Sequence, residues 1–257
     1  MIKDLSIFFK KETLVMGGLG FSAGLPIMLV FSTLSVWLVK AGVERSTVTL
    51  FSWAGFAYSF KFLWSPIVDK FRLPILNQYG HRRSWLFFSQ ILIIISILLA
   101  SLSDPQKNLS FMAISIVLIA FSSATQDIIV DAFRIESAPE KKQGPLASMY
   151  LAGYRVAMIV SGAGSLWLAS HFSGSVYQLE VWKNVYQIIS LFMLIGLIST
   201  FFAKEPLMLK KNNIKNFEQI KFTVSTVSSI VIFFIVYLSI PAINELNYFF
   251  SFLLNFF

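Results

Sequence analysis

Long apolar runs alternate with short polar segments along this chain. The runs cover residues 14–39, 47–68, 85–103, 109–133, 146–170, 182–203 and 222–240. Each run is long enough to cross about 30 Å of hydrocarbon as a helix with a rise of about 1.5 Å per residue. A last apolar stretch, residues 246–257, is too short to do so. The pattern predicts an all-α polytopic membrane protein with seven spans and an apolar stub.

The composition of the chain agrees with a membrane protein. Of its 257 residues, 56% are hydrophobic and 13% are charged, whereas a soluble domain has about 25% charged residues. The net charge of +8 does not indicate a nucleic-acid partner, because the basic residues lie between the apolar runs. We therefore expect contact with the lipid bilayer and not with nucleic acid. The absence of cysteine excludes disulfides and thiolate metal sites, and neither a metal nor a cofactor is predicted.

The distribution of Lys and Arg predicts the orientation of the chain in the membrane. If the N-terminus is cytoplasmic, fifteen of them fall in cytoplasmic segments and four in outer segments, which is the positive-inside pattern. Lys10 and Lys11 before the first run resemble the start of a signal peptide, but the run is too long for one. We therefore predict an uncleaved first helix and a cytoplasmic N-terminus.

Two carboxylates interrupt the fourth apolar run. Asp127 and Asp131 are four residues apart, so on a helix they share one face, about 6 Å from each other. A charge at the centre of a membrane helix costs about 2.5–3.5 kcal/mol, and such residues normally face a bundle interior or a wet cavity. The function of these two carboxylates therefore depends on which groups they face.

Two basic residues also lie inside apolar runs, Lys61 in the second and Arg155 in the fifth. Counted along ideal helices, both lie about 10–14 Å from the cytoplasmic ends of their runs, a depth similar to that of Asp127. If the three charges converge, Asp127 can stay ionised, and if the cations move away it should take up a proton. This is the requirement for a proton-coupled switch. The alternative is a fixed ion pair that only orients the helices.

Asp131 lies near the predicted interface, where Arg134 can fold back onto it, and we favour a helix-end salt bridge there over a functional role. Gln126 adjoins Asp127 and is a further polar candidate. The residues predicted to couple protons or bind substrate are Asp127, Asp131, Lys61, Arg155 and Gln126.

The first apolar run is rich in glycine and contains one proline. Glycines such as Gly20 and Gly24 allow close helix approach, and Pro26 frees a backbone carbonyl and permits a bend. Transporters often bind substrate at such broken helices. Close packing without any substrate role explains the same residues equally well, so both interpretations stay open.

The polar segment after the second run contains Asp69, followed by Arg82 and Arg83. This segment resembles the signature loop of the major facilitator superfamily. Six ordered stretches resemble the AmpG-type muropeptide permeases of that superfamily: GFSAGLP (20–26), AGV (41–43), KFLWSP (61–66), TQDIIVDAFR (125–134), GYR (153–155) and EP (205–206). The resemblance covers about residues 14–206, and the fourth stretch is its most specific part.

The resemblance implies a proton-coupled secondary transporter that imports anhydromuropeptides across the bacterial inner membrane. These substrates are the GlcNAc–anhydro-MurNAc products of cell-wall turnover, so a muropeptide and protons are the expected partners. The resemblance also implies two six-helix halves around a central cavity. A conformational or structural role is predicted for Asp69, Arg82, Arg83, Arg134, Gly24 and Pro26.

The resemblance also predicts how the chain is divided. Residues 1–206 are expected to form an N-terminal six-helix half, residues 207–221 a cytoplasmic basic linker, and residues 222–257 a seventh span with a truncated stub. Because a full permease has a second half, the expectation is either a half-transporter completed by self-association or a truncated, non-transporting fragment.

An enzyme is not expected. The two histidines, His81 and His171, lie on opposite sides of the predicted membrane, and without cysteine they leave no zinc site. An intramembrane aspartyl protease would need carboxylates facing each other, usually from two helices, whereas Asp127 and Asp131 lie on one. No catalytic residue is therefore predicted.

Overall fold

The computed structural model describes residues 6–74, 77–173 and 176–206, which contain helices and connecting segments but no strand. The chain divides into two compact units, Met1–Met208 and Leu209–Phe257, and all described residues belong to the first. The predicted basic linker, seventh span and stub lie outside the described residues, so the predicted division of the chain stays a prediction.

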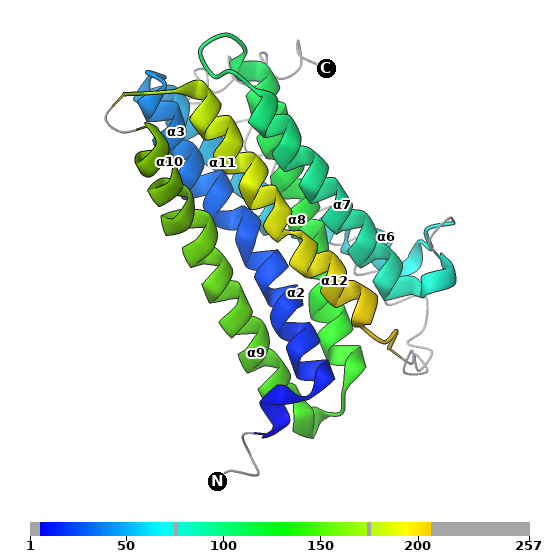
Figure 1. The fold of residues 1–257 in the computed structure, drawn as a ribbon. Coiled ribbons are helices and arrows are strands. Elements are labelled where there is room, and N and C mark those ends of the chain that lie inside the picture. Colours follow the sequence, from blue (N-terminus) through cyan, green and yellow to red (C-terminus); the bar gives the residue numbers. More distant parts are fainter. Residues whose placement is uncertain (1–5, 75–76, 174–175, 207–257) are drawn as a thin grey trace. The chain divides into compact units, whose positions relative to one another are not determined.

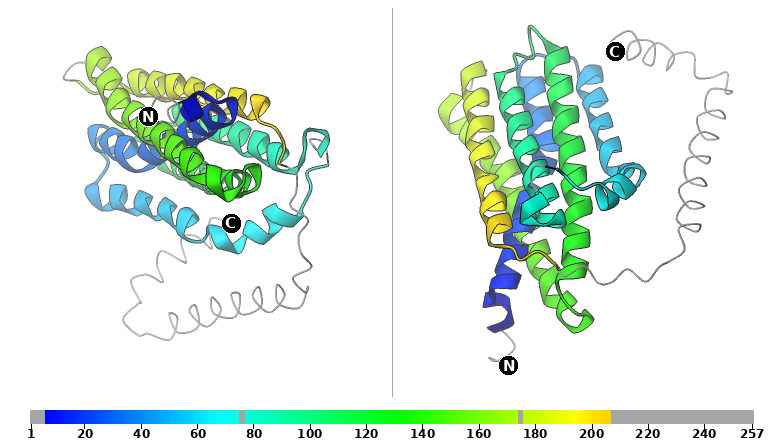
Figure 2. Two further views of the ribbon diagram at one scale, coloured as in Figure 1. Left: turned by 90° about the horizontal axis from the view of Figure 1, so that it is seen from below. Right: turned by 90° about the vertical axis from the view of Figure 1, so that its right-hand side faces the viewer.

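Five helical stretches of the described part are long and apolar enough to cross a membrane. Figures 1 and 2 show them side by side, with α8 and the stretch Leu179–Phe202 running opposite to the other three. The stretches are Lys11–Lys40, His81–Leu102 (α7), Leu109–Ser137 (α8), Glu140–Ser173 and Leu179–Phe202. They correspond to the first, third, fourth, fifth and sixth apolar runs, so the predicted all-α membrane fold is confirmed. The end of the bundle at which Lys11 lies is its N-terminal end.

The second apolar run does not form one continuous helix, contrary to the prediction for residues 47–68. It is divided into short helices that lie along α8 (Figure 2). These are α4 (Arg45–Leu50), η3 (Phe51–Gly55), α5 (Phe56–Ser59), η4 (Lys61–Leu63) and α6 (Ser65–Lys70). The helical path is disturbed at Phe60 and Trp64, whose ψ angles are 6° and −3°.

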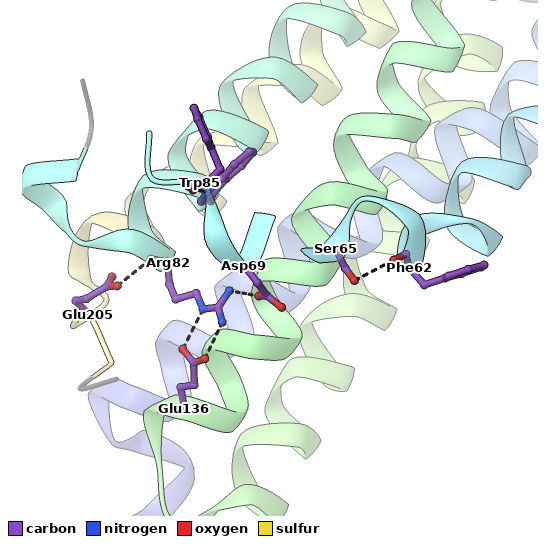
Figure 3. Close-up of polar contacts among 8 residues, drawn as sticks. Phe62, Ser65, Asp69, Arg82, Trp85, Glu136 and Glu205 are labelled. Atoms are coloured by element: carbon purple, nitrogen blue, oxygen red, sulfur yellow. Dashed lines mark hydrogen bonds and ion pairs between the residues drawn. The ribbon is translucent and has the colours of Figure 1, made fainter. Parts of the chain in front are cut away.

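Pro66 explains the interruption at Trp64. Proline has no N–H, and its ring clashes with the carbonyl group four residues earlier, which here belongs to Phe62. The Ser65 hydroxyl donates to the carbonyl oxygen of Phe62 at 3.2 Å (Figure 3), so the acceptor that the missing N–H leaves open is satisfied. Pro66 then lies in the first turn of α6, where an N–H has no intrahelical partner.

Two of the long helices contain a π-helical turn. The first consists of α2 (Lys11–Met28), the π turn η2 (Leu29–Thr33) and α3 (Leu34–Lys40). The fifth consists of α9 (Glu140–Ile159), the π turn η6 (Val160–Gly164) and α10 (Ser165–Ser173). The sixth is divided into α11 (Leu179–Phe192) and α12 (Leu194–Phe202).

Buried side chains from neighbouring elements bond to both π turns. The Thr33 hydroxyl donates to the carbonyl oxygen of Ser161 at 2.8 Å, and the Tyr186 hydroxyl donates to that of Leu29 at 3.0 Å. A π turn disturbs the regular ladder of helical hydrogen bonds, and these bonds hold its carbonyl groups in place. Pro26 precedes the first π turn by three residues, so the irregularity predicted for this helix is present.

Helices α2 and α9 approach each other more closely than side chains normally allow. A Cβ atom at Gly20 or Gly24 would collide with the main chain of Tyr150 or Tyr154, respectively. Only glycine therefore fits at these two contacts without a shift of the backbone. The close-packing interpretation of the glycine-rich run accounts for this geometry.

This contact generates the first testable prediction. Gly20→Ala should lower the thermal stability of the detergent-solubilised chain, because the added methyl group forces α9 outward at a cost of about 1–3 kcal/mol. Gly164→Ala is the matched control, since a Cβ atom there would make only an ordinary van der Waals contact, 3.7 Å from the carbonyl oxygen of Ile159. Circular dichroism on heating measures the effect. A melting temperature of Gly20→Ala no lower than that of Gly164→Ala would contradict the close contact.

Candidate functional site

An ion pair inside the bundle joins the broken second segment to α8. The Lys61 ammonium lies 3.7 Å from Oδ2 of Asp127, and the two side chains are 33% and 16% exposed. This distance is too long for a hydrogen bond. The other carboxylate oxygen, Oδ1, is buried, and within the described residues it accepts no hydrogen bond. Asp127 is therefore charge-paired but incompletely satisfied, and a new ligand or a proton can bind it.

The local irregularity of the second segment positions Lys61. Lys61 is the first residue of the short helix η4, which lies between the two disturbed residues Phe60 and Trp64. The indole N–H of Trp64 donates to the hydroxyl of Thr125 on α8 at 3.1 Å. This bond fixes the segment against α8 two residues before Asp127.

Arg155 does not join the pair, although its predicted depth is similar. Its side chain is exposed, and its guanidinium donates to the sulfur of Met158 on the same helix at 3.9 Å. Among the described residues, no ion pair connects Arg155 to a carboxylate. The preceding residue, Tyr154, interacts electrostatically with Asp127, and consecutive residues of a helix differ by about 100° in direction. Helical rise predicts the depth of Arg155 in the membrane but not the side of the helix from which its side chain projects.

Three tyrosines near Asp127 were missed by the sequence analysis. They are Tyr58 from the second segment and Tyr150 and Tyr154 from α9, and Tyr150 packs against the buried cluster that contains Ile129 and Val130 of α8. The spacing of four residues between Tyr150 and Tyr154 is a signal that could have found them, because such residues share one helix face.

The remaining candidates of α8 lie elsewhere. Asp131 is paired with Arg134 at 3.7 Å, and the Asp131 side chain is 52% exposed, which is the geometry expected for a helix-end salt bridge of small energetic value. Gln126 is fully buried, and its amide donates to the hydroxyl of Ser22 on α2 at 2.7 Å. Gln126 thus links two helices, and a role in substrate binding or proton coupling stays a prediction for both Asp131 and Gln126.

A second charged cluster lies at the N-terminal end of the bundle (Figure 3). The Arg82 guanidinium donates to Asp69 at 2.7 Å and, through two nitrogens, to both carboxylate oxygens of Glu136 at 2.9 and 2.7 Å. Such bidentate pairs are strong and directional. Asp69 lies near the end of α6 and Glu136 near the end of α8, whereas Arg82 lies at the start of α7. Arg82 therefore connects the ends of three helices.

Glu205 connects this cluster to the sixth helix. Its carboxylate accepts hydrogen bonds from the main-chain N–H groups of Arg82 and Arg83 at 2.8 and 3.0 Å, which satisfies the free donors at the start of α7. The Arg83 side chain donates to the carbonyl oxygens of Thr200 and Phe201 at the end of α12. Glu136 was missed by the sequence analysis, because a carboxylate near a helix end is common.

The sequence model of the Major Facilitator Superfamily matches residues 16–257, which extends beyond residue 206, where the recognised motifs end. The chain belongs to the Major Facilitator Superfamily. It is a multi-pass membrane protein.

The chain is similar to several permeases of this superfamily. It is 37% identical to the anhydromuropeptide permease of Escherichia coli (strain K12) over 202 residues, which make up 79% of this chain and 39% of that protein. It is 38% identical over 161 residues to the putative transporter AmpG 4 of Rickettsia felis, covering 63% of this chain and 39% of that protein. The putative transporter AmpG 3 of Rickettsia typhi is 34% identical over 77% of this chain and 46% of its own length.

Two facts follow from these matches. The resemblance to AmpG-type permeases that was recognised from short motifs is confirmed over most of the chain. The chain spans less than half the length of each of these relatives.

The Arg82 cluster generates the second prediction. Arg82→Lys should lower the free energy of unfolding by about 1–3 kcal/mol, because an ammonium group cannot replace the bidentate bonds and leaves partly buried carboxylate oxygens unpaired. Thermal unfolding of the solubilised chain measures the loss. Arg45→Lys is the matched control, since Arg45 is exposed. An Arg82→Lys variant as stable as Arg45→Lys would show that the cluster does not hold the helices together.

Proposed function

We propose that this chain forms one half of a proton-coupled importer of anhydromuropeptides in the bacterial inner membrane, with its N-terminus in the cytoplasm. The similarity to a protein named anhydromuropeptide permease supports the substrate class. The observation that carries the proposal is the intramembrane pair of Lys61 and Asp127, in which one carboxylate oxygen of Asp127 is buried without a hydrogen bond.

This pair supplies a mechanism for coupling. While Lys61 lies next to Asp127, the ammonium stabilises the ionised carboxylate. When Lys61 moves towards an anionic group of the substrate, Asp127 is left in a medium of low dielectric constant and takes up a proton. The peptide part of an anhydromuropeptide ends in a carboxylate, which can compete for Lys61. Substrate binding and proton uptake are then linked through one side chain.

The clusters around this pair take the conformational role in the proposal. The bonds of Asp69, Arg82 and Arg83 hold helix ends together at the N-terminal end, and opening them would let the helices move relative to each other. A movement of the helices relative to each other would involve α8 and α2. Helix α8 carries the pair of Arg134 and Asp131, and α2 carries Gly24 and Pro26.

The exposed face of α9 supports the proposal that a second helical half completes the transporter. Arg155 is exposed on this helix together with apolar residues such as Leu151 and Val156. A guanidinium in contact with hydrocarbon costs about 2.5–3.5 kcal/mol on insertion scales, so a protein surface or a wet cavity is needed there. Self-association of two copies provides such a surface.

Uptake of labelled anhydromuropeptide by cells that lack their own permease tests the proposed function. The chain expressed alone should mediate uptake that depends on the proton gradient, which would also require its copies to associate. Asp127→Asn should abolish gradient-driven uptake but retain exchange of labelled for unlabelled substrate, since exchange needs no net proton movement. Glu44→Gln, a change at an exposed carboxylate, is the control and should behave like the wild type.

The outcomes of this experiment are distinct. No uptake and no exchange by a wild-type chain that is normally inserted in the membrane would overturn the proposed transport by this chain. Gradient-driven uptake that persists in Asp127→Asn would overturn the role of Asp127 while leaving transport in place.

A further inference from the structure

Two tyrosines of α9 form an aromatic surface within the bundle. Tyr150 and Tyr154 are one helical turn apart, their ring centroids lie 6.0 Å from each other, and the ring planes are tilted by 41°. Both side chains are partly buried. The two rings therefore lie next to each other on one side of the helix.

This aromatic surface adjoins the charged pair. Tyr150 packs against the buried cluster that contains Ile129 and Val130 of α8, which follow Asp127 closely in the chain. The aromatic pair of α9 thus lies beside the helix that carries the carboxylate of the ion pair. Ligand sites combine apolar or aromatic walls with a few placed polar groups in this way.

The hydroxyl groups of the two tyrosines are not used for the fold. Within the described residues, neither of them makes a hydrogen bond to another protein group. The hydroxyl of Tyr186, by contrast, is bonded to the carbonyl oxygen of Leu29, and that of Tyr177 accepts a bond from Trp37. A partly buried tyrosine usually finds a partner for its hydroxyl, so these two are available to a ligand.

The packing of α2 fixes the position of this surface. Gly20 lies against the main chain of Tyr150, and Gly24 lies against that of Tyr154. The two glycines therefore set how closely the backbone of the tyrosines approaches the centre of the bundle. The glycine-rich run, whose role the sequence left open, acts here as the support of the aromatic pair.

We infer that Tyr150 and Tyr154 bind the sugar part of the substrate, an inference that rests on the proposed function. A sugar ring presents C–H groups on its faces and hydroxyl groups along its edge. A tyrosine offers an apolar ring for the first and a hydroxyl for the second. Lys61, the partner of Asp127, is left for the carboxylate of the peptide. The site thereby separates the two chemical parts of an anhydromuropeptide between two sets of side chains.

Binding to the purified full-length chain in nanodiscs tests this inference. The probes are the GlcNAc–anhydro-MurNAc disaccharide, the free peptide and the intact anhydromuropeptide. Tyr154→Leu should weaken disaccharide binding by about tenfold, which corresponds to about 1.4 kcal/mol, while Tyr154→Phe, which keeps the ring, should weaken it less. Binding of the free peptide should not change. Tyr79→Leu is the control, because Tyr79 is 44% exposed and lies outside the long helices.

A second measurement does not depend on the folding of a leucine variant. With 3-fluorotyrosine incorporated at the tyrosine positions, the fluorine resonances of residues 150 and 154 should shift when the disaccharide is added, and that of residue 79 should not. Resonances of 150 and 154 that stay unchanged while the disaccharide binds would overturn the inference. So would a chain that binds the intact anhydromuropeptide but not the disaccharide. A wild-type chain that binds none of the probes would overturn the proposed function itself.

Discussion

A charged group inside a membrane bundle needs a partner or access to water, and this constraint governs the described helices. Lys61 and Asp127 meet it only in part, because their atoms are 3.7 Å apart and one carboxylate oxygen has no hydrogen bond. Arg82 meets it fully, because its three guanidinium nitrogens donate to three carboxylate oxygens of Asp69 and Glu136. The contrast separates a site that can exchange partners from a cluster that holds helix ends together.

The helices reach these positions through departures from regular geometry. Glycines let α2 lie against the backbone of α9, and π turns in both helices are connected by the bond from Thr33 to Ser161. Interruption of the second segment before Pro66 places Lys61 opposite α8. Irregular turns of this kind are common at functional sites, and here the interruptions at Phe60 and Trp64 flank Lys61 of the ion pair.

The sequence predicted the positions of the helices better than the directions in which their side chains point. The length of the apolar runs alone predicted the five long helices of the described part. The helical rise predicted that Lys61 and Asp127 lie at a similar depth in the membrane. Depth does not determine which way a side chain points, so the exposed position of Arg155 and the link from Gln126 to Ser22 could not be foreseen. The run of residues 47–68 has the hydropathy of a span, but its helix is interrupted at Phe60 and at Trp64, and Pro66 explains the second interruption.

In the proposed mechanism, Asp127 takes up a proton when the substrate draws Lys61 away. Infrared difference spectroscopy measures this directly, because a protonated carboxyl group has a C=O stretching band that an ionised carboxylate lacks. Addition of anhydromuropeptide to the purified wild-type chain should produce such a band, and the band should be missing in Asp127→Asn. Substrate that binds to the wild type without producing the band would contradict the account.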